Sequence, residues 1–67
     1  MIDPLEKAAE CDRAIELCSD PDRMVLLTSL RGMWIVIGNM KARGSYGWND
    51  QALDLVKVHA DILKSPQ

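Results

Sequence analysis

The chain has 67 residues, a formal net charge of −2 and two cysteines. A single domain of this length buries only about 60% of the surface that its unfolded chain exposes, so such domains usually add a disulfide, a metal or a partner subunit. The longest apolar run, Met33 to Ile37, is far shorter than the roughly 20 residues that span a bilayer. We therefore expect one soluble domain, residues 1–67, with no membrane contact.

The first predicted element is a helix over residues 4–19. Asp3-Pro4 begins this helix. Proline has no backbone N–H, but at the first helical position that N–H would have no partner within the helix. The preceding Asp can accept hydrogen bonds from the free N–H groups of the first turn. Glu6 is placed to reach back as in a capping box. Mostly small residues recur on one face and permit close approach of another helix: Met1, Leu5, Ala8, Cys11, Ile15 and Cys18.

Asp20-Pro21 repeats this signal and predicts the tip of a helical hairpin, followed by a second helix over residues 21–43. Gly38 is an alternative end for this helix, but Lys41 and Arg43 continue its pattern before Gly44, so we favour the later end. The main core stripe is expected at Leu26, Leu27, Leu30, Met33, Trp34 and Ile37.

The second helix is apolar over more of its circumference than one partner helix can cover. Gly32 stands at the centre of this additional surface; a helical Gly costs about 1 kcal/mol relative to Ala, but it lets a second backbone come close. The surface is covered either by the third helix or by another subunit, and we favour the subunit interface, although both can hold in part. The predicted interface residues are Val25, Thr28, Gly32, Ile35 and Val36.

Charge divides along the chain. Residues 1–22 carry seven acidic and two basic residues, a net −5, whereas residues 23–49 carry four basic residues and no acidic one, a net +4. The first two helices therefore attract each other, and we expect them to dock antiparallel with charges neutralised along their edges.

The third predicted helix covers residues 49–64, with Asn49 or Asp50 as its cap. Its inner face is expected at Ala52, Leu53, Val56, His59, Ala60 and Leu63, widened by Leu55 and Ile62. No segment sustains the alternation of a strand. The predicted fold is all-α, an antiparallel hairpin with a third helix, as a three-helix bundle that oligomerisation can complete. The third helix packs in its own chain or, as the less favoured alternative, is exchanged with a neighbouring subunit.

Little in the sequence points to catalysis. His59 is the one histidine, lies in an apolar stripe, and is expected to be a core or interface residue with one hydrogen bond. A zinc site would require Cys11, Cys18, His59 and a carboxylate to converge, and two ligands seven residues apart on a helix cannot chelate one ion. We expect no enzymatic activity, no cofactor and no metal. The two cysteines are also too far apart on a helix for a disulfide, and no signal peptide is recognisable, so we expect reduced thiols and a cytoplasmic location.

Lys41, Arg43, Tyr46 and Trp48 mix cations with aromatic rings around a glycine-containing loop, which is the kind of surface that stacks on bases and contacts phosphates. The signal is short and the chain is acidic overall, unlike the basic footprint of most nucleic-acid binders. A nucleic-acid-associated accessory protein is therefore the alternative function, and self-association through the second helix, with a dimer favoured and any other protein partner unknown, is the preferred one.

Three strings of residues carry a resemblance: Ala8-x-x-Cys11-x-Arg13-Ala14, Asp20-Pro21-x-Arg23-x-x-Leu26-Leu27, and Trp34 with Ile37. Over residues 8–37 the chain resembles short uncharacterised bacterial helical-hairpin proteins that share an Ala-x-x-Cys helix, an Asp-Pro turn, a Leu-Leu pair and a Trp. The resemblance implies a helical hairpin and brings no known activity. The segment from Gly44 onward departs from that pattern.

Overall fold

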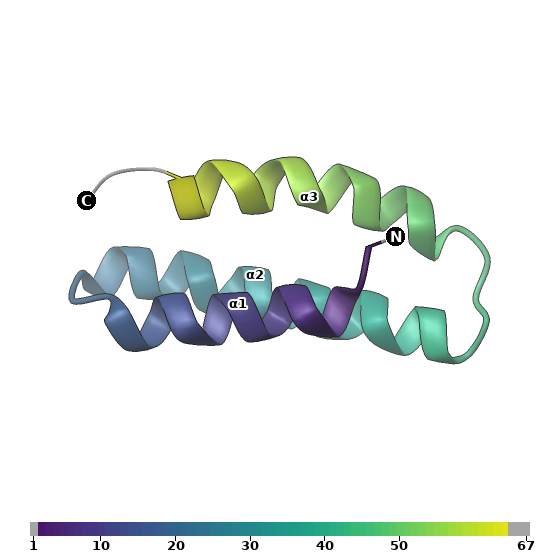
Figure 1. Cartoon of the computed structure of the whole chain (residues 1–67), viewed down its shortest axis with the longest axis horizontal. Coiled ribbons are helices and arrows are strands. Elements are labelled where there is room, and N and C mark those ends of the chain that lie inside the picture. The colour runs from purple at the N-terminus through teal and green to yellow at the C-terminus, as the bar shows by residue number, and fades with distance from the viewer. Residues whose placement is uncertain (1, 65–67) are drawn as a thin grey trace.

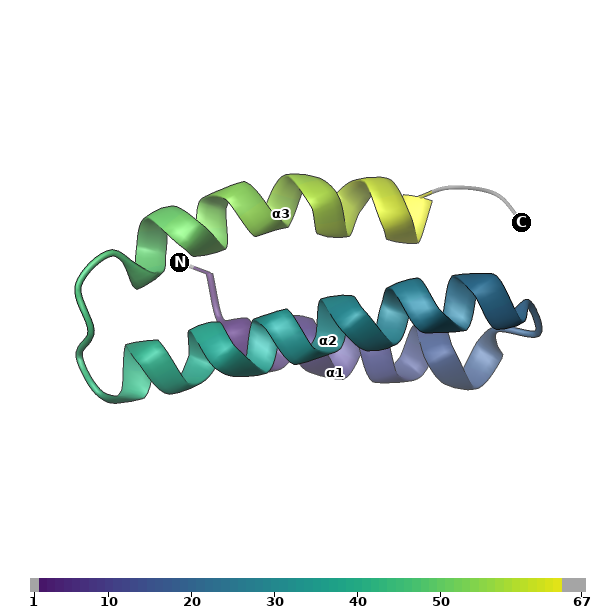
Figure 2. The ribbon, with the colours of Figure 1, turned by 180° about the vertical axis from the view of Figure 1, so that it is seen from behind.

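The computed structural model describes residues 2–64, and these form three helices: α1 (Pro4–Leu17), α2 (Pro21–Ala42) and α3 (Trp48–Lys64). α1 and α2 make an antiparallel hairpin, and α3 folds back along α2 of the same chain (Figure 1). Seen from behind, α2 lies in front of α1 and α3 runs above it (Figure 2). The body measures 37 × 17 × 17 Å. The predicted all-α fold of three helices is confirmed, and none of the described helices has the length and apolar character needed to cross a membrane.

Both Asp-Pro pairs start helices as the sequence predicts. Asp3 Oδ1 accepts from the backbone N–H groups of Leu5 and Glu6 at 3.1 and 3.4 Å, and Asp20 Oδ1 accepts from that of Asp22 at 3.1 Å. These bonds satisfy N–H groups that have no partner within the helix, and the proline at the first position of each helix removes another.

The helix ends differ slightly from the prediction. α1 stops at Leu17, with Cys18 as its C-cap, so it is shorter than expected. α2 continues through Gly38 to Ala42 with Arg43 as its C-cap, which is the later of the two ends considered.

The prediction that Asn49 or Asp50 caps the third helix is wrong, because α3 already begins at Trp48. The carbonyl of Gly47 accepts from the N–H of Gln51 at 3.2 Å, so the helix starts one residue before the predicted range of 49–64. Gly47 has a φ of +86°, a conformation that glycine adopts without the steric cost of a Cβ.

Side chains of all three helices form the core around Trp34. The buried cluster consists of Ala8, Cys11, Leu30, Trp34, Ile37, Ala52 and Leu55. Five residues that the sequence placed on core faces are instead exposed: Leu5, Leu26, Met33, Leu53 and Ala60. Each helix has an apolar arc wider than the sector it buries, so the position of its neighbours decides which part turns inward. Met1, also placed on the core face, lies outside the described residues.

Of the two glycines inside α2, Gly38 faces α1 and Gly32 does not. A Cβ at Gly38 would lie 3.0 Å from Leu5 Cδ2, whereas a Cβ at Gly32 would meet nothing within 4 Å. Arg31 of α2 forms an ion pair with Asp12 of α1. This pairing agrees with the attraction predicted from the opposite net charges of the two segments. The hairpin therefore uses one helical glycine for its own packing and leaves the other at the surface.

We predict that Asp20→Ala lowers the free energy of unfolding by about 1 kcal/mol, because it leaves the first turn of α2 without its side-chain acceptor. Asp20→Asn keeps an acceptor oxygen at the same place and is the matched control, with a smaller loss. Urea denaturation followed by circular dichroism measures both. An equal loss in the two variants would contradict a capping role for Asp20.

Candidate functional site

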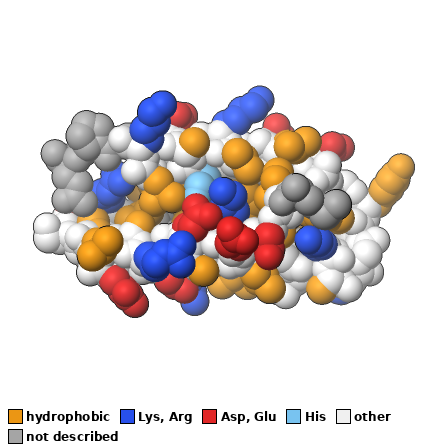
Figure 3. Space-filling model, in the orientation of Figure 1, with side chains coloured by type: hydrophobic (Ala, Val, Ile, Leu, Met, Phe, Trp, Pro, Cys, Tyr) orange, Lys and Arg blue, Asp and Glu red, His pale blue; other side chains and the backbone are white. Residues whose placement is uncertain are grey.

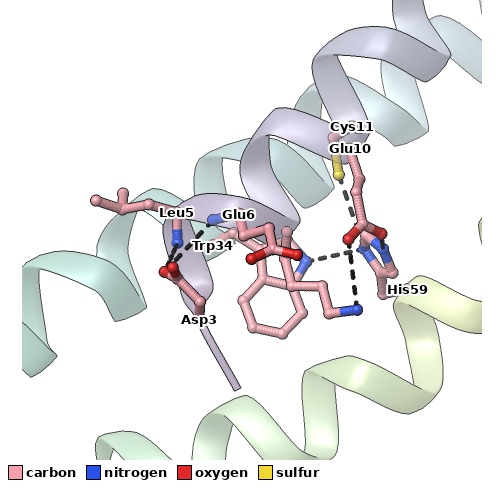
Figure 4. A network of polar contacts seen from close by, with 8 residues as sticks. Asp3, Leu5, Glu6, Glu10, Cys11, Trp34 and His59 are labelled. Carbon is pink, nitrogen blue, oxygen red and sulfur yellow. Dashed lines mark hydrogen bonds and ion pairs between the residues drawn. The ribbon is translucent and has the colours of Figure 1, made fainter. Parts of the chain in front are cut away.

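A chain of polar side chains crosses the core where the three helices meet (Figure 4). His59 of α3 is only 4% exposed. Its Nδ1 lies 3.0 Å from Nε1 of Trp34 on α2, and its Nε2 lies 3.0 Å from Oε1 of Glu10 on α1. The Sγ atom of Cys11 is 3.8 Å from the same Nδ1. One imidazole ring thus links all three helices.

The partners of His59 determine which ring nitrogen carries the proton. An indole N–H can only donate, so Nδ1 must accept from Trp34 and must itself be unprotonated. Nε2 then carries the hydrogen and donates to the Glu10 carboxylate.

The expectation of one hydrogen bond to His59 is wrong, because both ring nitrogens have hydrogen-bond partners. The ring also makes a T-shaped contact with Trp34, with the centroids 5.7 Å apart. Neither Glu10 nor Trp34 was predicted as a partner of His59. The sequence does contain a signal for the Trp34 contact. Trp34 and His59 each place a polar ring nitrogen on an apolar helix face, and buried polar groups need hydrogen-bond partners. Which of them meet depends on how α3 lies along α2.

Glu10 connects the buried hydrogen bonds of Trp34 and His59 to the surface. Its side chain is 29% exposed and also lies 3.6 Å from the ammonium of Lys7. The hydrogen bond from His59 holds the pKa of Glu10 below its ordinary value of 4.5, against the effect of burial, and Lys7 acts in the same direction as His59. In Figure 3 the pale-blue histidine is visible at the seam between α3 and α1, next to red and blue charged side chains.

Cys11, His59 and Glu10 follow the order of a thiol, an imidazole and an orienting carboxylate, but their environment opposes thiolate chemistry. The Cys11 side chain is fully buried. Burial raises the pKa of its thiol, and the charges of Glu10 and Asp12 raise it further. The Nδ1 atom that would take the thiol proton is already the acceptor for Trp34. The arrangement is that of a structural element.

The ligands considered for zinc do not converge. Cys18 Sγ donates to the carbonyl of Asp20 at the hairpin turn, at 3.4 Å, whereas Cys11 lies beside His59 in the core. Over residues 2–64, no three His, Cys, Asp or Glu side chains are placed to hold a metal ion.

The second candidate site is an apolar groove of about 770 Å³ between α2 and α3. From α2 it is lined by Ser29, Gly32, Met33, Val36 and Ile37. From α3 it is lined by Gln51, Asp54, Leu55 and Val58. Arg31 and Gly38, which face α1, lie on the other side of α2, so the groove opens away from α1.

The predicted interface residues lie on adjoining sectors of α2. Gly32 and Val36 line the groove, and Val25 and Thr28 are exposed beside it. Ile35 is half-buried and packs against the core, so it is less available to a partner. Met33 and the α3 wall of the groove were not predicted as parts of this surface, because the position of α3 is not encoded in the pattern of α2.

The predicted nucleic-acid residues do not form one platform. The Lys41 ammonium lies over the Trp48 ring, 5.1 Å from its centroid, and Trp48 itself packs against the core. Tyr46 is 96% exposed at the loop, and Arg43 is exposed at the end of α2. Two of the four residues therefore contact each other, and the other two project from the loop region separately.

No family model, curated protein or solved structure matches the chain. The resemblance to helical-hairpin proteins stays a prediction.

Stability should depend on the Glu10 carboxylate in acid. Because its pKa is lower in the folded protein than in the unfolded chain, its contribution is complete above the ordinary value of 4.5 and is lost as the pH falls through the folded-state pKa. We expect the difference in unfolding free energy between wild type and Glu10→Gln to shrink over that range. Denaturant titrations at a series of pH values measure it. Glu16→Gln, on the exposed side of α1, is the matched control, and an equal acid response in both variants would contradict this role of Glu10.

The two thiols should react at different rates. In the native protein a thiol reagent should modify the half-buried Cys18 quickly, and Cys11 only when the chain unfolds, because Cys11 is fully buried and its pKa is raised. The Cys18→Ser variant isolates Cys11 for this measurement, and the same variant in urea is the control. Rapid labelling of Cys11 without denaturant would contradict a structural role and favour thiol chemistry.

Proposed function

We propose that this protein is a cytoplasmic protein-interaction module that forms a homodimer through α2. The observation that supports the proposal is the apolar surface of α2 that neither α1 nor α3 covers. Val25 is 65% exposed, Val36 57% and Met33 46%, and all three lie within the longest helix.

Met33 and Val36 also line the groove between α2 and α3, so these two exposed side chains form one patch with the groove and are not isolated positions. Single exposed apolar residues are ordinary in monomeric proteins, but a contiguous patch beside a groove is typical of an interaction site. An open groove with two helical walls suits a helix laid along it, which is a common mode of recognition.

Burial of this patch in a dimer would also increase the stability of a domain whose own core is small. The chain buries few large side chains, with Trp34, Leu27 and Leu30 among the largest. Each additional square ångström of apolar surface removed from water contributes about 25 cal/mol. A dimer therefore adds the stability that a 67-residue domain lacks by itself.

Nucleic-acid binding by Lys41, Arg43, Tyr46 and Trp48 is less well supported. The cation of Lys41 already lies on the Trp48 ring, so the two groups that would contact a phosphate and a base are directed at each other.

We expect wild-type protein to elute as a dimer in size-exclusion chromatography with light scattering at tens of micromolar. Val36→Glu should shift it to monomer, because a carboxylate would have to be buried without a partner at the interface. Leu17→Glu makes the same change at an 86% exposed residue of α1 and should leave the dimer intact. A monomeric wild type would contradict the proposal, as would equal behaviour of the two variants.

A further inference from the structure

We propose that the two copies pack α2 against α2 in antiparallel orientation, about a twofold axis near Gly32, with Asp22 of each copy paired to Arg43 of the other. This inference rests on the proposed dimer and adds its geometry and its specificity. It follows from the residues on the uncovered face of α2.

That face carries a continuous row. At 100° per residue, its members fall within an arc of about 80°: Asp22, Val25, Ser29, Gly32, Val36 and Arg43. All six are exposed. They recur at alternating spacings of three and four or at sums of these, which is the period of a seam between two packed helices.

The charges at the two ends of the row are opposite. Asp22 and Arg43 lie about 32 Å apart along the helix, at 1.5 Å per residue, and the midpoint falls between Gly32 and Met33. A second copy turned end for end about this midpoint brings its Arg43 opposite Asp22 and its Asp22 opposite Arg43. Parallel copies would instead place like charges together at both ends, which is unfavourable. The row is therefore complementary to itself in the antiparallel orientation.

The centre of the row permits close contact. A Cβ at Gly32 would meet nothing within 4 Å, so the backbone of α2 is open to an approaching helix at the proposed axis. Ser29 on the adjacent turn is also small. Where small residues meet, two helices can pack more closely and gain dispersion contacts along their backbones.

The groove then receives the partner helix. Met33 and Val36 form its wall on α2, and Leu55 and Val58 form its wall on α3. A partner α2 laid there contacts both helices, and by symmetry this α2 occupies the groove of the partner. The two α2 and two α3 helices make a four-helix core, and each α1 lies on its outer side, behind α2 in the view of Figure 2. Gln51 and Asp54 lie at the rim, where polar groups stay hydrated.

Charge exchange at the ends of the row tests the arrangement. Asp22→Arg and Arg43→Asp should each weaken dimerisation about tenfold, because each replaces two attractive pairs with two repulsive ones. The double variant should restore association to near the wild-type level, since it recreates both pairs with their signs reversed. Sedimentation equilibrium at low ionic strength measures the dissociation constants. Recovery in the double variant also shows that the changed helix ends still fold.

Glu16→Arg and Arg13→Asp, exposed positions of α1, are the matched controls for net charge and should leave the dissociation constant unchanged. A dimer that neither single exchange weakens would overturn the antiparallel pairing while leaving the proposed function in place. A wild type that stays monomeric would overturn both, and would leave the groove to a helix of another protein.

Discussion

The chain of hydrogen bonds from Trp34 through His59 to Glu10 determines how the third helix lies on the hairpin. α3 packs mainly on α2, and its single buried polar side chain is the histidine that meets both other helices. Moving α3 by one turn would separate the imidazole from the indole N–H and from the carboxylate. Each buried polar group left without a partner costs about 1–3 kcal/mol. The hydrogen bonds of Trp34, His59 and Glu10 therefore select one register of α3 among several that apolar packing alone would allow.

The register of α3 in turn creates the apolar groove. With His59 held against Trp34, Leu55 and Val58 come to lie beside Met33 and Val36 of α2. α1 occupies the other side of α2, where Arg31 and Gly38 contact it. One face of α2 therefore remains uncovered because the buried polar chain and the hairpin contacts have fixed both neighbours elsewhere. The apolar groove is thus a consequence of the internal hydrogen bonds and the hairpin contacts.

The two helical glycines of α2 have separate physical roles. Gly38 faces α1, where a Cβ would lie only 3.0 Å from Leu5 Cδ2, so its missing side chain serves the packing of the hairpin. Gly32 is exposed, and a Cβ there would meet no atom of residues 2–64 within 4 Å, so no contact among these residues offsets the cost of a helical glycine. In the proposed dimer, the helix of a second copy would supply that contact, which connects the local cost with the proposed assembly.

The sequence by itself determined the helices and their order. Asp3-Pro4 and Asp20-Pro21 specify two helix starts through short-range hydrogen bonds, and the charges of the first two segments favour the hairpin. It did not determine the inward sectors of the helices, so Leu26, Met33 and Leu53 were assigned to the core although they are exposed. An apolar arc is wider than the buried sector, and rotating a helix within that arc leaves its local interactions unchanged. Only the tertiary contacts of Trp34, His59 and Glu10, which are far apart in sequence, decided the rotation and with it the groove.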